Sequence, residues 1–148
     1  VHGLGGTKTS LARIMDIFLD MGYNVLAIDQ RNSGDNQAPY NTFGVLESLD
    51  ILDAINVAKS KMENEGRLIL WGESYGGASA AMAAGRDDSK IDALILESPV
   101  ADFNEMLDGE LIKIEKSHIK IEPTTNSICL FYSILKYVII VNRCNIIL

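Results

Sequence analysis

Helix-like and strand-like segments alternate along the first 97 residues, and no other feature of this chain limits its fold as strongly. Three segments, at residues 11–21, 45–58 and 75–85, carry apolar or small residues at helical spacing. Each is followed by a short apolar run, at residues 24–29, 67–71 and 91–97. Strands that are separated by helices cannot form hairpins with one another. The order therefore predicts an α/β fold with a mostly parallel sheet and flanking helices.

The second helical segment has an apolar stripe that should face the sheet. The stripe consists of Val45, Leu49, Leu52, Ile55 and Ala58. Two acids, Glu47 and Asp50, come early in this segment, and Lys59 and Lys61 come late. This placement agrees with the helix dipole, so we interpret all four charges as helix-end partners.

Charge and cysteine content exclude several classes of protein. The 148 residues carry 20 acidic and 13 basic side chains, a net charge of -7, so we expect no nucleic-acid partner. The two cysteines, Cys129 and Cys144, provide neither a disulfide framework nor a CxxC metal site, which favours a reducing, cytoplasmic location. The first residues lack the pattern of a secretory signal. No cluster of metal-ligand residues is visible, and we expect no metal and no cofactor.

A GxSxG pentapeptide, Gly72-Glu73-Ser74-Tyr75-Gly76, joins a predicted strand to a predicted helix. The pattern alone should occur by chance in roughly one chain of this length in twenty, so its placement carries the interpretation. A sharp strand-to-helix turn lifts a serine hydroxyl clear of the backbone, where a histidine can activate it. We interpret Ser74 as a nucleophile. The alternative is that Ser74 only caps the helix after a glycine turn.

A glycine-rich loop, His2-Gly3-Leu4-Gly5-Gly6, precedes the first helix. Acyl transfer needs two N–H donors aimed at the developing oxyanion. The backbone of Tyr75 at the helix start is one candidate, and Leu4 is the other, with Gly5 next. The alternative is a phosphate loop, but the segment matches neither GxGxxG nor GxxxxGK[ST].

Residues 1–107 resemble the middle of an α/β-hydrolase fold protein. HGLGG resembles the oxyanion loop after the third strand of that family, and YNVLAIDQRNSGDN resembles its fourth strand and following loop. GESYGG resembles the nucleophile elbow, and IDALILESPVADF resembles the sixth strand. Within the superfamily, the segments are most similar to serine aminopeptidase, lysophospholipase-like and prolyl-oligopeptidase-tail hydrolases. Asn32 stands where such proteins usually have glycine, which predicts a loop of different shape.

The resemblance implies a serine hydrolase that acts on an ester, thioester or amide through an acyl-enzyme on Ser74. It also implies an acid and then a histidine after the serine. The chain offers Asp102 as acid and His118 as base, but fifteen residues separate them, too few for the strands that normally bring the histidine back. We therefore expect a partial fold that lacks its N-terminal strands and its C-terminal triad-bearing strands, with a short Asp102–His118 triad as the alternative. His2 is expected to brace its loop.

Residues 108–148 differ in composition from the rest of the chain. Eleven of the twelve glycines lie in the first 85 residues. The apolar run at residues 128–141 contains Lys136 and is shorter than the about 20 residues that span a membrane, so we expect no membrane association. We favour a read-through or frameshifted tail, with a divergent strand and helix or a membrane-associating segment as alternatives.

The sequence leaves two functions open. One is hydrolysis of a small-molecule ester or a peptide substrate, which this chain performs incompletely if its base and acid lie elsewhere. The other is a non-catalytic fragment or interaction module that keeps the GxSxG turn without a working base. The pattern does not predict whether the chain itself turns over substrate, nor its oligomeric state.

Overall fold

A parallel sheet forms the centre of the chain in a computed structural model, which describes residues 1–62, 66–102 and 145–147. The strands are β1 (Asn24–Val25), β2 (Arg67–Glu73), β3 (Ala93–Glu97) and β4 (Asn145–Ile147), and their spatial order is β1-β4-β2-β3. All three pairings between them are parallel. The predicted α/β class, with a parallel sheet and flanking helices, is therefore confirmed.

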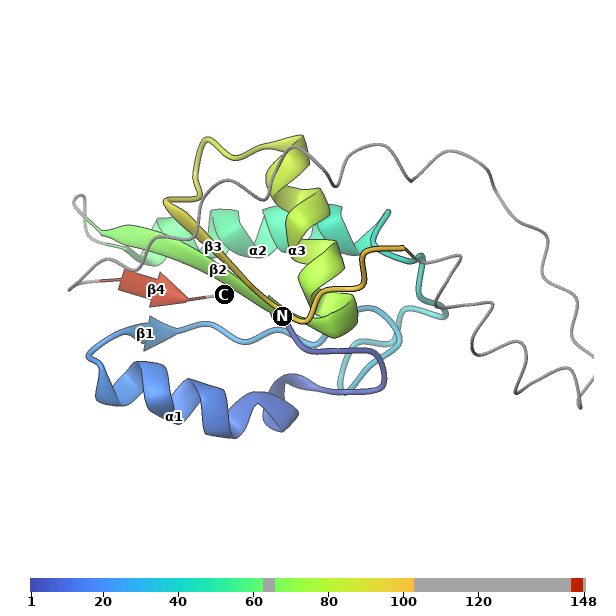
Figure 1. The fold of residues 1–148 in the computed structure, drawn as a ribbon, viewed down its shortest axis with the longest axis horizontal. Coiled ribbons are helices and arrows are strands. Elements are labelled where there is room, and N and C mark those ends of the chain that lie inside the picture. The colour runs from blue at the N-terminus through green and yellow to red at the C-terminus, as the bar shows by residue number, and fades with distance from the viewer. Residues whose placement is uncertain (63–65, 103–144, 148) are drawn as a thin grey trace, which may run out of the picture.

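Helices cover both faces of the sheet. The 3-10 helix η1 (Lys8–Leu11) leads into α1 (Ala12–Asp20), and α2 (Glu47–Lys61) and α3 (Ser74–Arg86) follow. Figure 1 shows α1 on one face of the sheet and α2 with α3 on the other. A Schellman motif ends α1, because Tyr23 N–H donates to Phe18 O while Gly22 has φ 83.

Strand β2 is buried on both of its faces, which explains its continuous apolar sequence. Leu68 and Leu70 pack in one core cluster with residues of α2 and α3. Ile69 and Trp71 point the opposite way and pack with Leu11 and other residues of the α1 side. Alternate side chains of a strand face opposite sides, so a strand between two helical layers needs apolar residues at every position.

Strand β1 is shorter than the apolar run that predicted it. It pairs with β4 only through Asn24 opposite Ile146 and Val25 opposite Ile147. A parallel ladder needs a hydrogen-bonded partner at each position, and β4 has three residues. Leu26 and Ile28 still pack against the core next to β1, although they are not assigned to a strand.

The start of the chain lies beside β2 as well. The Val1 amino group donates to Trp71 O at 2.7 Å, and Glu73 N–H donates to Val1 O at 3.2 Å. The side chain of Val1 belongs to the same core cluster as Leu68. Val1 therefore continues the line of β4 along this edge of β2.

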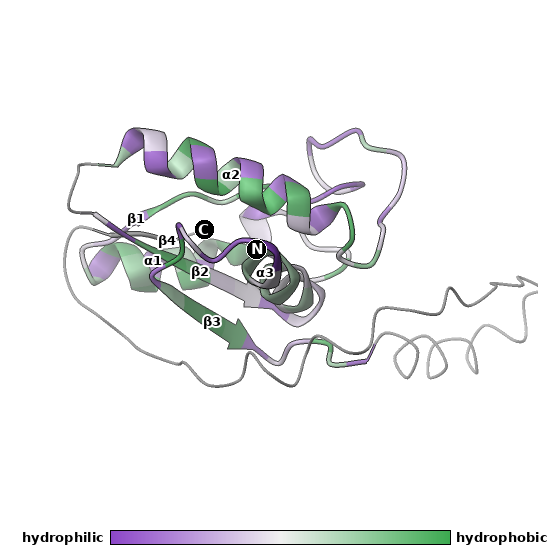
Figure 2. Ribbon diagram, turned by 90° about the horizontal axis from the view of Figure 1, so that it is seen from above, coloured by the Kyte–Doolittle hydropathy of each residue, from purple (hydrophilic) through white to green (hydrophobic). Residues whose placement is uncertain are grey.

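The predicted stripe of α2 is confirmed only in part, since Ile55 and Ala58 are buried and Leu52 packs against the core. Ile51, Ile55 and Ala58 are buried, together with Glu47 and Ser48. Val45 and Leu49, two members of the predicted stripe, are 43% and 44% exposed. The prediction was wrong for these two because the Glu47 carboxylate turns inward to accept hydrogen bonds. Figure 2 shows polar and apolar residues alternating along α2.

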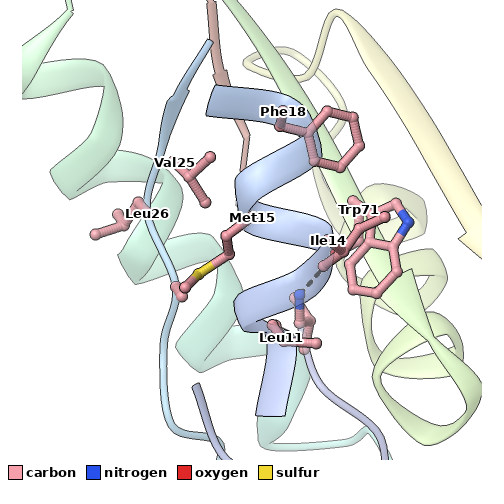
Figure 3. Close-up of a pocket in the computed structure, with 9 residues that line it drawn as sticks. Leu11, Ile14, Met15, Phe18, Val25, Leu26 and Trp71 are labelled. Carbon is pink, nitrogen blue, oxygen red and sulfur yellow. Dashed lines mark hydrogen bonds between the residues drawn. The ribbon is translucent and has the colours of Figure 1, made fainter. Parts of the chain in front are cut away.

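A small cavity lies between α1 and the sheet. Figure 3 shows that apolar side chains of α1 point toward Val25, Leu26 and Trp71 across it. Its volume is about 10 Å³, at the lower limit for one water molecule, and its lining is apolar. The α1 side of the sheet therefore contributes packing. The candidate functional site lies at the carboxyl ends of the strands, where Ser74 follows β2.

Two apolar residues of α2 that differ in burial, Ile55 and Leu49, give the first testable prediction. Ile55→Ala should lower the free energy of unfolding by about 2–5 kcal/mol, because it removes a side chain that is 1% exposed. Leu49→Ala is the matched control and should cost less than about 1 kcal/mol. Urea denaturation followed by circular dichroism measures both, and equal losses would contradict the observed face of α2.

Candidate functional site

Ser74 lies where β2 turns directly into α3. Glu73 is the last residue of the strand and Ser74 is the first residue of the helix. The backbone of Ser74 has φ 49, a left-handed conformation that costs a residue with a Cβ roughly 1–2 kcal/mol. The N-cap of α3 is Glu73, with φ -110 and ψ 143, so the alternative that Ser74 is the capping residue is wrong.

Three glycines make this turn possible because the backbones around it touch. A Cβ on Gly72 would lie 2.5 Å from Gly76 O, and a Cβ on Gly77 would lie 3.0 Å from Gly72 O. A Cβ on Gly76 would overlap His2 O and would lie 2.5 Å from Val1 O. The GxSxGG pattern is therefore a steric requirement of the contact between β2, α3 and the chain start.

The HGLGG loop (residues 2–6) lies against Ser74. Gly6 N–H donates to Gly3 O at 3.1 Å, and Gly5 has φ 75, which is the position that demands glycine in a type II turn. A Cβ built on Gly3 would lie 3.5 Å from Ser74 Cβ. The Gly3 N–H is occupied, since it donates to Glu73 Oε1 at 3.2 Å. Leu4 follows at the corner of the turn and is 55% exposed.

His2 anchors the start of this loop. Its Nε2 accepts the Gln30 N–H at 3.0 Å, so the ring is neutral with its proton on Nδ1, which donates to Gly3 O at 2.8 Å. Gln30 Nε2 in turn donates to His2 O. Burial is the main cause that lowers the pKa of His2. Both ring nitrogens are engaged and the residue is 1% exposed, so His2 braces the loop and is not placed to deprotonate Ser74.

Asp29 holds Lys8, in the short helix η1 that follows the HGLGG loop. Its carboxylate accepts Lys8 N–H at 2.7 Å and Lys8 Nζ at 2.6 Å, and Asp35 N–H donates to it at 3.0 Å. The hydrogen bond from the Lys8 side chain is the main cause that lowers the pKa of Asp29 to about 2. The HGLGG loop is therefore held on both sides by residues that follow β1.

The loop after β1 does not need the different shape that Asn32 predicted. Asn32 has φ 54, in the left-handed region that glycine favours. Asparagine is one of the few other residues that adopt this conformation readily. The backbone at this position can thus follow the course that a glycine would take.

Of the two remaining predicted site residues, Asp102 and His118, the structure describes only Asp102. Val100 N–H donates to Ser74 O at 3.2 Å, so the segment after β3 returns to the turn, and Asp102 follows two residues later. His118 lies outside the described residues, as do Cys129 and Cys144. In the part of the chain that is described, no helix is long and apolar enough to cross a bilayer.

Glu47, which the sequence indicates only as a helix-end charge, is buried beside Tyr75. It is 1% exposed and accepts hydrogen bonds from Thr42 and Gly44. Tyr75, the neighbour of Ser74, is also 1% exposed, and its side chain interacts with Glu47. The sequence signal that could have indicated Glu47 is an acid at the start of a helix, five residues after Thr42 and three residues after Gly44.

Comparison with known sequences assigns the family. The sequence model described as alpha/beta hydrolase fold matches residues 1–115. The chain belongs to the α/β-hydrolase fold family. This finding agrees with the parallel sheet, the order of its segments and the strained turn at Ser74.

Several curated relatives are similar to this hydrolase-fold chain. YqkD of Bacillus subtilis (strain 168) is 32% identical over 107 residues, which is 72% of this chain and 35% of YqkD. YfhR of Escherichia coli (strain K12) is 30% identical over 123 residues, 79% of this chain and 43% of YfhR. A rice protein, Esterase PIR7B of Oryza sativa subsp. japonica, is 33% identical over 97 residues, 64% of this chain and 35% of the esterase. The chain thus spans less than half the length of these relatives.

The crowded glycines generate the second prediction. Gly76→Ala should lower the free energy of unfolding by more than about 3 kcal/mol, since the new methyl group meets backbone oxygens that cannot move independently. Gly5→Ala is the control, because nothing lies within 4 Å of its Cβ position and only the left-handed backbone costs about 1–2 kcal/mol. Thermal and urea unfolding of both variants measure the difference. A smaller loss in Gly76→Ala than in Gly5→Ala would refute the close contact.

The neutral His2 generates the third prediction. Its folded pKa lies below the unfolded value of about 6.5, so the unfolded chain binds the proton more readily as the pH falls. The stability that His2 contributes should be complete above about pH 6.5 and decline below it. Urea midpoints between about pH 7.5 and pH 5 should therefore fall more steeply in the wild type than in His2→Gln. Parallel pH profiles would show that His2 is not held neutral.

Proposed function

We propose that this chain carries the nucleophile of a serine hydrolase that acts on an ester, thioester or amide through an acyl-enzyme on Ser74. The observation that carries the proposal is the strained Ser74 between β2 and α3, with Gly3 of the HGLGG loop packed against it. The family and the rice esterase relative support hydrolysis as the reaction class.

The chemistry assigns a role to each neighbour of Ser74. The Oγ attacks the substrate carbonyl carbon while its proton passes to a general base, which gives a tetrahedral oxyanion. The backbone N–H groups of Tyr75 and Leu4 are proposed to donate to this oxyanion. Collapse expels the alcohol, thiol or amine, which takes a proton, and water then hydrolyses the acyl-serine.

The general base and its orienting acid are proposed to lie mainly outside the described residues. His2 is engaged at both nitrogens. Asp102 and His118 stay the candidates within this chain for acid and base. The relatives are more than twice as long as the stretch that they share with this chain, which leaves ample length for a triad acid and histidine elsewhere.

The substrate class follows from the same proposal. An acyl-enzyme route suits a small-molecule ester or a peptide, and it requires neither a metal nor an organic cofactor. Cytoplasmic location and the division into residues 1–107 and a divergent tail at 108–148 remain predictions from the sequence.

A second candidate function is binding without turnover. The observation that favours it is that His2, the one histidine among the described residues, has both ring nitrogens engaged within and behind the HGLGG loop. A chain with the turn and the loop but no base would hold a carbonyl group without cleaving it.

The fourth prediction separates the two functions. A fluorophosphonate probe should label the wild-type chain on Ser74, because the reagent reports an activated serine, and Ser74→Ala should not be labelled. Ser60→Ala, which removes an exposed serine of α2, is the control and should be labelled like the wild type. Intact-mass and peptide mass spectrometry locate the adduct.

A p-nitrophenyl butyrate assay then tests turnover. Hydrolysis that disappears in Ser74→Ala would exclude the binding-only function. A folded wild-type chain that is neither labelled nor active would instead exclude catalysis by this chain.

A further inference from the structure

A buried carboxylate lies beneath the residue that follows Ser74. Glu47 is 1% exposed, and its two oxygens accept three hydrogen bonds from the turn that precedes α2. The donors are Thr42 N–H at 2.7 Å, Thr42 Oγ1 at 2.5 Å and Gly44 N–H at 2.9 Å. Burial raises the pKa of Glu47, but these hydrogen bonds outweigh it and bring the pKa below its usual value. Glu47 is therefore ionised in the fold.

Tyr75 contributes its side chain to the same cluster. Burial of the phenol, followed by the negative charge of Glu47, raises the pKa of Tyr75, so the two side chains interact. The Tyr75 ring also contacts the Phe43 ring edge-on, with centroids 6.2 Å apart and an interplanar angle of 75°. The Tyr75 side chain thus packs on the 42–44 turn and interacts with the carboxylate that holds this turn.

The 42–44 turn is itself strained and packed against α3. Phe43 has φ 50 and Gly44 has φ 91. A Cβ on Gly44 would lie 2.5 Å from Met82 Sδ of α3. Both positive φ values are maintained next to the three hydrogen bonds to Glu47. The carboxylate therefore joins the turn before α2 to the first turn of α3.

We propose that Glu47 is a positioning residue, which acts through the Tyr75 side chain to hold the Tyr75 backbone N–H beside Ser74. This inference rests on the proposed function, in which that N–H donates to the oxyanion. A rotation of the first turn of α3 would move the Tyr75 hydroxyl away from Glu47. Oxyanion donors must be held to within about half an ångström, so a fixed charge under Tyr75 is a suitable anchor.

The chain offers a matched control on the same helix. Asp50 lies one turn after Glu47 and forms an ion pair with Arg31, with Nε and Oδ2 2.7 Å apart. Asp50→Asn makes the same chemical change as Glu47→Gln, from carboxylate to amide, at a carboxylate whose described partner is Arg31. Tyr75→Phe removes only the hydroxyl and keeps the buried ring.

The first readout needs no turnover. Two-dimensional NMR of the whole chain should show that Glu47→Gln and Tyr75→Phe move the amide resonances of Ser74, Tyr75 and Gly76 in the same direction. Asp50→Asn should leave these three resonances in place. Unchanged resonances in both Glu47→Gln and Tyr75→Phe, with the chain folded, would overturn the positioning role.

The second readout is the rate of fluorophosphonate labelling at Ser74 per folded molecule. We expect a loss of about 10- to 100-fold in Glu47→Gln and in Tyr75→Phe, the scale of a misplaced oxyanion donor. The double variant should be no slower than Glu47→Gln, because both changes break one contact. Asp50→Asn should label like the wild type. A rate per folded molecule equal to that of the wild type in both variants would make Glu47 purely structural and overturn the proposal.

The two readouts separate the two proposals. If the wild-type chain is not labelled at Ser74, the proposed function fails for this chain, and the amide resonances alone decide whether Glu47 positions the turn. If Glu47→Gln does not fold, Tyr75→Phe decides instead. An unchanged labelling rate in folded Tyr75→Phe would refute the role of Glu47 while leaving Ser74 as the nucleophile.

Discussion

The contact between backbones where β2 turns into α3 is the constraint on which the rest of the structure depends. Gly72, Gly76 and Gly77 bring the strand, the helix and the chain start closer together than any side chain would permit. The same contact fixes the angle at which α3 crosses the sheet and the position of the HGLGG loop beside Ser74. It also sets the return of the chain after β3, since Pro99 packs on Gly77 and Val100 bonds to Ser74.

Much of the fold could be predicted because its signals are local. The continuous apolar sequence of β2 predicts that both faces of the sheet are covered. The helical periodicity that stops before Gly22 predicts the end of α1. The length of β1 and its pairing with β4 could not be predicted, since residues 24–25 and 145–147 lie far apart in the sequence. Local patterns do not contain that information.

Some residues of the candidate site could likewise be predicted from the sequence, and others could not. Ser74 and the HGLGG loop could be recognised because their glycines are required by sterics and so appear as a motif. Glu47 could not, because an acid in the first turn of a helix is also what the helix dipole favours. Its burial depends on the conformation of residues 42–44, where Phe43 and Gly44 have positive φ. A local charge pattern cannot distinguish a solvated carboxylate from one that organises a turn.

The shared edge of β2 has a consequence for the topology of the sheet. β4 lies opposite residues 67–69 of β2, and Val1 bonds to Trp71 and Glu73 on the same line. Any extended segment joined in front of Val1 would point toward the backbone groups that β4 occupies between β1 and β2. The two segments could not both pair with this edge of β2. An extended tag fused before Val1 would therefore compete with β4 for the backbone groups of β2.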